Sequence, residues 1–360
     1  MRPIRLGKED LHLPQAALAL MLGAAGAALA MLAQLPLPIL LGPMIAVAGS
    51  SVLGLRIGGL TPALPQDLRL WLIPIIGVSI GGAFHPGLLS DALRWWPTFL
   101  ALLVYLPLAH ALGYLTYTRL GGLDHATALF GSVPGGLLEA ITMGEEAGAD
   151  LQMLTMLQFL RLIGCIVLVP LGFSLLTGMV VGSAGGAQIA GSGQPMLVAD
   201  AIVLGGTAVA GALIGRRIGL PGAIITGPVL LSGAAHLAGL TAAVPPLWMV
   251  HLTQLVIGTS LGLRFSGLPR GAFRRAFGLA LVTVALTLGL GFGFALLLHG
   301  AVGQEVGTVF LAFAPGGISE MSLVALSLHV SVIYVTAHHV ARIVLAVAFA
   351  RLFALQILRS

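Results

Sequence analysis

Long apolar segments alternate along the whole chain with short stretches that carry Pro, Gly or charged residues. A helix that crosses the ~30 Å hydrocarbon core of a bilayer needs about 20 mainly apolar residues, and many of these segments approach that length. The pattern predicts an all-α integral membrane protein with about ten transmembrane helices. We expect these helices at residues 15–34, 38–55, 69–84, 97–117, 152–177, 199–215, 222–240, 247–263, 276–298 and 331–350.

Two further apolar segments, 124–148 and 305–328, are interrupted in the middle by Pro-Gly-Gly. Proline removes a backbone donor and glycine permits a tight reversal, so each segment should form two half-helices of ~15 Å. We expect both segments to be re-entrant, with tips near the midplane of the bilayer. They would instead cross as broken helices if another apolar segment in each half did not cross.

The second half of the chain repeats motifs of the first half. The offset is 181 residues for Gly77-Val-Ser-Ile-Gly81 and Gly258-Thr-Ser-Leu-Gly262, for Pro134 and Pro315, and for Arg161 and Arg342; it is 185 for Leu-Leu-Gly-Pro43 and Ile-Thr-Gly-Pro228. A near-constant offset over several motifs indicates a duplication. We therefore predict a first membrane repeat at 1–178, a Gly/Ser-rich linker at 179–198 and a second membrane repeat at 199–360.

Composition agrees with a membrane protein and argues against nucleic-acid binding. Hydrophobic residues make up 58% of the 360 residues and charged residues 8%, against roughly 25% charged residues in a soluble domain. The net charge of +5 comes from basic residues scattered between apolar runs, which is typical of loop anchors. The basic N-terminus followed by an apolar run resembles a signal peptide, but its length favours a retained first helix.

The distribution of basic residues in the loops predicts the topology of the two repeats. If both broken segments cross the membrane, the loop residues divide 8 to 7 between the two sides, and no orientation is favoured. If both are re-entrant, the division becomes 14 to 1, with Arg94 the exception. We therefore expect two inverted-topology repeats with both termini in the cytoplasm. Inverted repeats with interrupted helices at the midplane are common in secondary transporters.

The broken segments and the spans that follow them hold the candidate site. Glu139 and Glu320 fall in the first turn of the returning half-helices, and Arg161 and Arg342 lie 22 residues later, at the depth of the tips. Ionisable groups at that depth are costly and point to function. Either each Glu caps its half-helix and each Arg neutralises a Glu, or the arginines and free helix amides bind an anionic substrate while a Glu takes a proton or holds a coupling cation. The candidate substrate- and ion-binding residues are Pro134, Gly135, Gly136, Glu139, Arg161, Pro315, Gly316, Gly317, Ser319, Glu320, His339 and Arg342.

The remaining polar residues predict no catalytic or metal site. His338 and His339 are adjacent on a helix and point about 100° apart, so buried hydrogen bonds are favoured over a metal pair. His339 matches Gln158 in the first repeat, and both lie three residues before an arginine. The single cysteine, Cys165, lies in an apolar run and excludes an intramolecular disulfide. We expect no enzyme activity and no cofactor.

The two Pro-Gly-Gly blocks and their surroundings resemble the AbrB family of polytopic membrane proteins. The resemblance rests on Pro134-Gly-Gly-x-x-Glu followed by Ala-Gly-Ala-Asp150, on Ala-Pro315-Gly-Gly-Ile-Ser-Glu320-Met followed by Ala-His-His-x-x-Arg342, and on Leu-Leu-Gly-Pro43. Members are often labelled transcriptional regulators or ammonia monooxygenases. The resemblance implies a permease more than either of those activities.

These observations favour a secondary transporter for a small, anionic organic solute, coupled to protons or cations. Its partners would be the solute, the coupling ion and the lipid bilayer, without nucleic acid, and it would lie in the bacterial cytoplasmic (inner) membrane with homo-oligomers possible. The alternatives are a membrane regulatory or scaffold protein and, less favoured, a membrane-bound monooxygenase.

Single cysteines test the predicted inversion. In a Cys165→Ser background, Gly122→Cys should label from the cytoplasm and Gly303→Cys from the outside, because the two broken segments enter from opposite sides. The measurement is labelling by a membrane-impermeant maleimide, before and after permeabilisation. Labelling of both positions from the same side would contradict the inverted topology.

Overall fold

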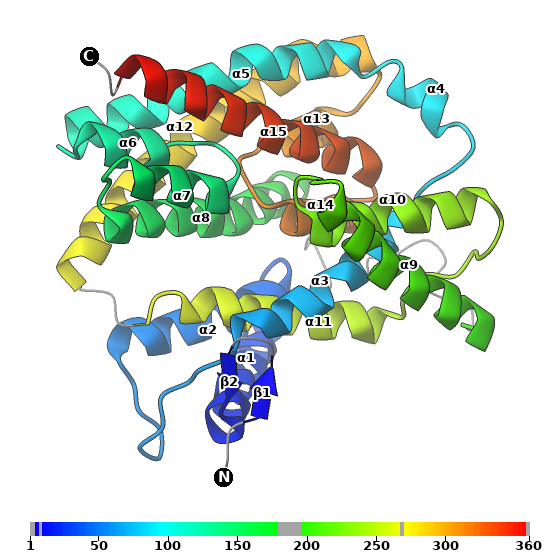
Figure 1. Ribbon diagram of the computed structural model, residues 1–360, viewed down its shortest axis with the longest axis horizontal. Coiled ribbons are helices and arrows are strands. Elements are labelled where there is room, and N and C mark those ends of the chain that lie inside the picture. The colour runs from blue at the N-terminus through cyan, green and yellow to red at the C-terminus, as the bar shows by residue number, and fades with distance from the viewer. Residues whose placement is uncertain (1–3, 7–8, 179–195, 267–269, 358–360) are drawn as a thin grey trace. The chain divides into compact units, whose positions relative to one another are not determined.

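The computed structural model describes residues 4–6, 9–178, 196–266 and 270–357, and nearly all of its regular structure is helical (Figure 1). A small antiparallel pair of strands, β1 (Ile4–Leu6) and β2 (Glu9–Leu11), precedes the first helix. The linker predicted at 179–198 lies mainly outside the described residues.

A helix occupies each of the ten ranges that the apolar segments predicted. These helices are α1 (Leu13–Leu32), α2 (Pro38–Leu53), α3 (Gln66–Gly81), α5 (Trp96–Leu115), α8 (Leu151–Thr177), α9 (Val198–Arg217), α10 (Ala223–Leu237), α11 (Leu247–Leu263), α12 (Arg270–Val302) and α15 (Val332–Ile357). Among the described residues six helices are long and apolar enough to cross a membrane, namely α1, α5 with the π-helical turn η1 (Thr116–Leu120), α8, α9, α12 and α15. The other four have 15 to 17 residues, so ten full spans stay a prediction.

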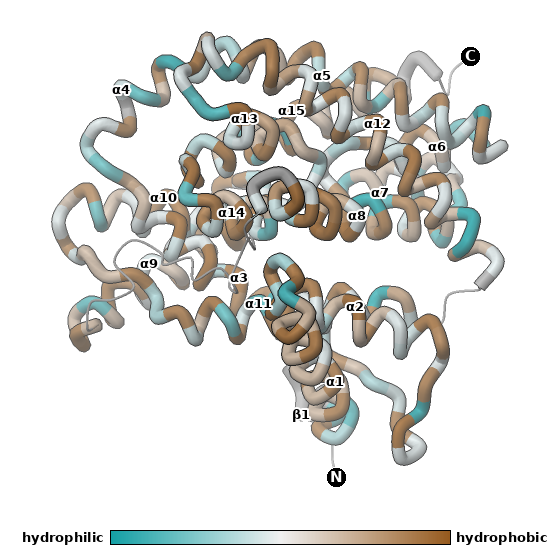
Figure 2. Tube along the Cα trace, turned by 180° about the vertical axis from the view of Figure 1, so that it is seen from behind, coloured by the Kyte–Doolittle hydropathy of each residue, from teal (hydrophilic) through white to brown (hydrophobic). Residues whose placement is uncertain are grey.

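Apolar residues cover most of the surface of these helices (Figure 2). Large side chains such as Leu32, Leu297 and Trp71 are more than 70% exposed. Soluble proteins rarely expose apolar surface on this scale, whereas a bilayer covers it. The chain is therefore a multi-pass helical membrane protein.

The chain folds as two compact units, and each unit draws on both predicted repeats. Unit 1 comprises Met1–Pro86, Pro170–Leu268 and Ser322–Ile333, and unit 2 comprises Gly87–Val169, Pro269–Met321 and Tyr334–Ser360. Unit 1 holds α1 to α3 and α9 to α11, and unit 2 holds the two broken segments with α5, α12 and most of α8 and α15. The compact units and the predicted repeats thus divide the chain differently.

Close contacts in unit 1 occur in equivalent pairs. Gly26 on α1 lies against Gly42 on α2, and Gly211 on α9 lies against Gly227 on α10, both at the offset of 185. Helix α3 packs on α10, where Gly77 faces Ile225 and Pro228, and α11 packs on α2, where Gly258 faces Leu40 and Pro43. The small residues let the helix backbones touch, which is their common role in membrane interfaces. The contacts also agree with the duplication, because each one recurs at the expected residues.

In unit 2, α5 and α12 lie side by side and run in opposite directions (Figure 1). The Tyr105 hydroxyl on α5 donates to the Thr287 carbonyl on α12 over 3.3 Å, and Arg275 near the start of α12 donates to Gly121 just beyond η1. A short helix that the sequence did not predict, α4 (Leu88–Ala92), precedes α5. A core of Leu129, Phe130, Val133, Ala140, Leu154, Ala346 and Ala350 joins the first broken segment to α8 and α15.

A methyl group at a glycine contact should destabilise unit 1. A Cβ on Gly227 would collide with the backbone of Gly211, so we expect Gly227→Ala to lower the free energy of unfolding by about 1 to 3 kcal/mol. The matched control is Gly206→Ala on α9, where a Cβ meets open space and should gain up to about 1 kcal/mol from helix propensity. Denaturant unfolding in detergent measures both. Equal effects of the two substitutions would show that backbone contact at Gly227 is unimportant.

Candidate functional site

The first broken segment consists of α6 (His125–Gly131) and α7 (Leu137–Glu146), joined by the Pro134-Gly135-Gly136 turn. Asp124 caps the start of α6 by accepting from the Thr127 amide at 2.8 Å. Burial acts to raise the pKa of this carboxyl, but hydrogen bonds from Thr127 lower the pKa overall. Pro134 and Gly135 are buried, and Gly136 has a left-handed φ of 64°, which favours glycine at the reversal.

The second broken segment consists of α13 (Val306–Phe313) and α14 (Ile318–Ser327), joined by Ala314-Pro315-Gly316-Gly317. Ala314 has φ −57° and ψ 131°, so the helix ends directly before the proline. Pro315 and Gly316 are buried. The predicted interruptions at both Pro-Gly-Gly motifs are therefore present in the structure; whether the segments re-enter the membrane is a separate question.

Both arginines donate to the carbonyl ends of the entering half-helices. Arg161 on α8 donates from Nη1 to the Val133 carbonyl, and Arg342 on α15 donates from Nη1 to the Ala314 carbonyl. The Nη2 of Arg342 also donates to the Gly316 carbonyl at 2.5 Å. The last carbonyls of a helix have no partner within it, and the C-terminal end of the helix dipole favours a cation. The arginines thus complete the broken helices, a role that the sequence analysis did not consider.

The residues three positions before the arginines serve the same purpose. Gln158 donates to the Phe130 carbonyl at 2.7 Å, and His339 donates from Nε2 to the Leu311 carbonyl at 2.8 Å. All four donors and their acceptors correspond at an offset of 181 residues. Arg342 Nη2 lies 3.1 Å from His339 Nδ1, which must accept, so His339 is neutral with its proton on Nε2.

The glutamates fold back onto the glycines of their own tips. A Cβ on Gly136 would lie 3.2 Å from the Glu139 carboxylate, and one on Gly317 would collide with the Glu320 carboxylate. Each Glu occupies the third position of its returning half-helix, as in a capping box, where the positive dipole end favours an anion. The two positions differ, because Glu320 is 7% exposed and Glu139 is exposed. Ser319 beside Glu320 is half-buried.

The two tips meet at Arg342. Gly135 of the first tip lies against the backbone of Arg342 and Ile343, and Gly316 of the second tip accepts from the Arg342 guanidinium. Gly317 lies near Leu162, which is the equivalent of Ile343. The structure therefore brings the predicted tip residues and arginines together inside unit 2.

Buried polar atoms without a partner remain at this meeting point. They include the Nε of Arg161, the Nε of Arg342 and the Oε1 of Gln158. Arg161 is 5% exposed, Arg342 is 2% exposed, and Gln158 is fully buried. Unpartnered buried groups are uncommon and mark places where a water, an ion or a ligand binds. Two donors of like charge and one neutral acceptor fit an anion with a hydroxyl or amide group.

Sequence reasoning missed two buried histidine contacts. His110 on α5 bonds through Nε2 to the Leu129 carbonyl at 2.9 Å, which adds a third donor to the end of α6. His338 bonds through Nε2 to the hydroxyl of Thr98, 240 residues away, at 2.8 Å. Neither contact has a spacing that the sequence reveals. Among the described residues, no group of three or more His, Cys, Asp and Glu side chains is placed to hold a metal ion.

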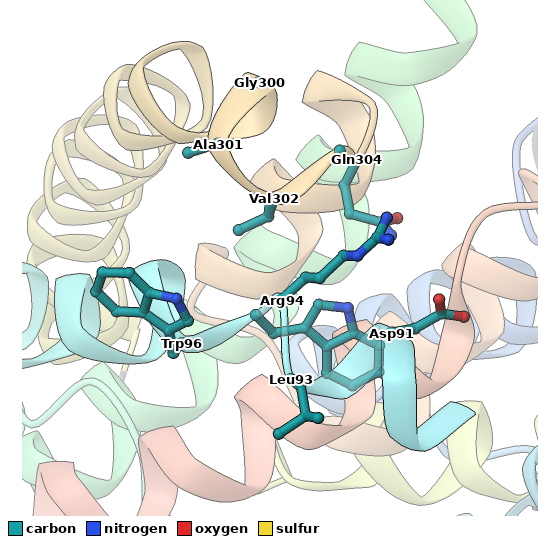
Figure 3. A pocket seen from close by; sticks show the side chains of 10 residues that line it. Asp91, Leu93, Arg94, Trp96, Gly300, Ala301, Val302 and Gln304 are labelled. Carbon is teal, nitrogen blue, oxygen red and sulfur yellow. The ribbon is translucent and has the colours of Figure 1, made fainter. Parts of the chain in front are cut away.

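A pocket of about 520 Å³ lies at one end of unit 2, between the start of α5 and the end of α12 (Figure 3). Asp91, Arg94, Trp95 and Trp96 line one side, and residues 300–304 line the other. The Arg94 side chain extends toward Gln304 (Figure 3). Arg94 is the basic residue that the charge distribution placed apart from the others.

Comparison with known proteins supplies a family. The family model described as "Transition state regulatory protein AbrB" matches residues 50–357. The chain is 26% identical over 294 residues to "Putative regulator AbrB" of Escherichia coli (strain K12), covering 81% of this chain and 82% of that protein. It is 24% identical over 297 residues to "Uncharacterized protein YhjN" of Bacillus subtilis (strain 168), covering 78% and 77%.

Removing the Arg342 guanidinium should destabilise the protein. Arg342→Gln leaves the Ala314 and Gly316 carbonyls unpaired, and we expect the free energy of unfolding to fall by about 3 kcal/mol. Arg351→Gln, an exposed position on the same helix, is the matched control and should change stability by about 0.5 kcal/mol or less. Denaturant unfolding in detergent measures both. An arginine that served only a solute would show the opposite sign, because its loss would relieve a buried charge.

Proposed function

The chain belongs to the AbrB family, and from this premise we propose that it is a secondary transporter for a small, anionic organic solute, coupled to protons or cations. One observation carries the proposal: two broken helices meet inside an apolar unit at two buried arginines whose Nε atoms have no partner. Interrupted helices at the centre of a membrane unit are the usual substrate sites of secondary transporters.

The tip contacts suggest how a solute would be held and released. Each arginine binds a carbonyl end through Nη1 and presents its Nε to the interior, so it can serve the helix and a solute anion together. The charged ends of the four half-helices are matched by arginine or glutamate, and this matching lowers the cost of keeping polar backbone in the bilayer. A solute that bound Nε would thus contact both broken segments through one pair of side chains.

Two contacts in unit 2 support the re-entrant topology within this proposal. Arg275 donates to Gly121, so the end of η1 and the start of α12 lie on the same side. Trp95 and Gly303 line one pocket, so the opposite ends of α5 and α12 also share a side. The number of crossings between Gly121 and Arg275 must then be even. Helices α8 to α11 supply four crossings, and a crossing by 124–148 would make the number odd.

We infer the setting of the protein from the same topology. Both termini would face the cytoplasm, the second repeat would be inverted relative to the first, and the protein would lie in the bacterial cytoplasmic membrane. Its partners would be the solute, the coupling ion and the lipid bilayer, without nucleic acid and without a chemical step on the solute.

A regulatory function is the second candidate, because the family description and the Escherichia coli relative both carry the word regulator. A membrane regulator would need the fold of unit 2 but no passage for a solute. Its effect would survive Glu139→Gln and Glu320→Gln together, whereas a transporter that uses these carboxylates would lose coupling.

Proteoliposomes test the transport proposal. Wild-type protein should accumulate at least one small organic anion from a broad panel under an imposed proton or sodium gradient. Arg342→Lys keeps the charge but loses the planar fork that holds the Ala314 and Gly316 carbonyls, so uptake should fall at least tenfold. Initial rates of labelled solute entry measure the effect.

The matched control is Arg351→Lys, which lies on the same helix at an exposed position and should leave uptake unchanged. Thermal unfolding of each variant separates loss of fold from loss of transport. Equal uptake by wild-type protein and Arg342→Lys would overturn the role of the tips. No accumulation of any solute by stable wild-type protein would favour the regulatory candidate.

A further inference from the structure

The two adjacent histidines of α15 have different hydrogen-bond surroundings. His339 is fixed as a neutral ring, because Nε2 donates to Leu311 and Nδ1 accepts from Arg342. A proton on its Nδ1 would meet the guanidinium of Arg342 directly. His338 points instead toward α5 and is also fully buried.

Both ring nitrogens of His338 lie beside oxygens that can accept. Nδ1 is 2.8 Å from the Tyr334 carbonyl, which can only accept, so Nδ1 carries a proton. Nε2 is 2.8 Å from the Thr98 hydroxyl. That hydroxyl has one proton, and it lies 2.8 Å from the Trp95 carbonyl, to which it donates. If all three hydrogen bonds are formed, Nε2 must donate as well, and His338 is an imidazolium.

The neutral ring requires one hydrogen bond to change. Without the Nε2 proton, the Thr98 hydroxyl must turn its own proton toward Nε2 and release the Trp95 carbonyl. The Thr98 hydroxyl therefore has two orientations, one for each charge state of His338. The atoms need not move apart, since the same three contacts serve both states.

Aromatic rings surround His338 and suit a cation. Phe99 stacks on the imidazole with ring centroids 4.1 Å apart and planes 10° apart, and the Tyr334 ring centroid also lies at 4.1 Å. Trp95 lies at 6.5 Å. Aromatic faces attract a cation most strongly where water is excluded. Burial itself opposes the charge, so these rings and the two acceptors are what would stabilise the imidazolium.

Few ionisable groups face this ring. The α5 residues in contact with His338, namely Trp95, Thr98 and Phe99, are not ionisable at neutral pH. On α15 itself the ionisable neighbours are Tyr334 and His339, and Arg342 lies beyond His339. Among these groups Arg342 carries the fixed positive charge, and the neutral ring of His339 stands between it and His338.

We propose that His338 is a proton-binding site, and that its charge state is passed through the Thr98 hydroxyl to Trp95 at the wall of the Arg94 pocket. The proton comes from water and returns to water, with no change in covalent structure besides the N–H bond. The inference deepens the proposed function, on which it rests for its use: this proton would be the coupling ion. Trp95 lines the pocket and contacts both His338 and Tyr334, so the proton site lies directly behind that wall.

The test uses tryptophan fluorescence and needs no solute. In full-length protein, Trp71→Phe, Trp96→Phe and Trp248→Phe leave Trp95 as the single tryptophan. Emission is followed in detergent from roughly pH 8 to pH 4, the range in which a histidine in a perturbed environment titrates. We expect a single transition with lower emission on the acid side, because an imidazolium beside an indole quenches it.

Variants assign the transition to its atoms. His338→Gln should abolish it, and His339→Gln should retain it. Thr98→Val removes the acceptor of the Nε2 proton and should move the midpoint about one pH unit lower or more, whereas Thr98→Ser should restore the midpoint. Thermal unfolding checks that each variant is folded, and if His338→Gln does not fold, the Thr98→Val and Thr98→Ser pair decides.

Absence of a transition in folded wild-type protein, a transition that persists in His338→Gln, or equal midpoints for Thr98→Val and Thr98→Ser would overturn the proposal. Because the titration involves no transport, its outcome is separate from that of the liposome experiment. A proton site without uptake would leave this inference standing and remove the proposed function, and uptake without the transition would do the reverse.

Discussion

The structure depends on one constraint: polar backbone groups at a helix end must find partners even where the surroundings are apolar. Unit 2 contains four such ends at its two Pro-Gly-Gly turns. Arg161 and Gln158 satisfy the first set of carbonyls, and His339 and Arg342 satisfy the second set. Glutamates lie at the opposite ends of the turns, where amide groups are free. The charges of the site are therefore explained first by the broken helices themselves.

This explanation changes how the arginines contribute to function. A buried guanidinium that binds only carbonyls is a structural part, whereas one that keeps an unpartnered Nε can bind an anion without leaving the helix end. Because Arg342 contacts both tips, a ligand at its Nε would be sensed by both broken segments. The same residues can therefore hold the unit together and bind a solute, and the two readings of the sequence do not exclude each other.

Much of this arrangement could be predicted from the sequence. Proline and glycine break helices through local chemistry, so the turns at Pro134 and Pro315 were foreseeable, as were the helices of the apolar segments. The duplication also predicted that Gln158 would behave like His339, because equivalent positions meet equivalent carbonyls. The small pairs at Gly77 and Gly258 were expected to be packing contacts, and in the structure they face the backbone of Ile225 and Leu40.

Other features could not be predicted, because they depend on contacts between distant segments. Thr98 and His338 are 240 residues apart, and no pattern in either segment indicates the other. Glu139 and Glu320 occupy equivalent positions in the sequence but differ in exposure, since burial is set by the surrounding helices. The choice of carbonyls as partners for the arginines also needed three dimensions, because a glutamate 22 residues away is the more obvious partner on paper.

Solute counterflow tests the central claim most directly, because it requires a passage and no driving gradient. Vesicles that hold wild-type protein are loaded with an unlabelled organic anion and diluted into a trace of the labelled anion. The account predicts a transient accumulation of label inside that disappears in Arg342→Lys but not in Arg351→Lys. Absence of counterflow for every anion tested, in vesicles whose protein is folded, would contradict transport.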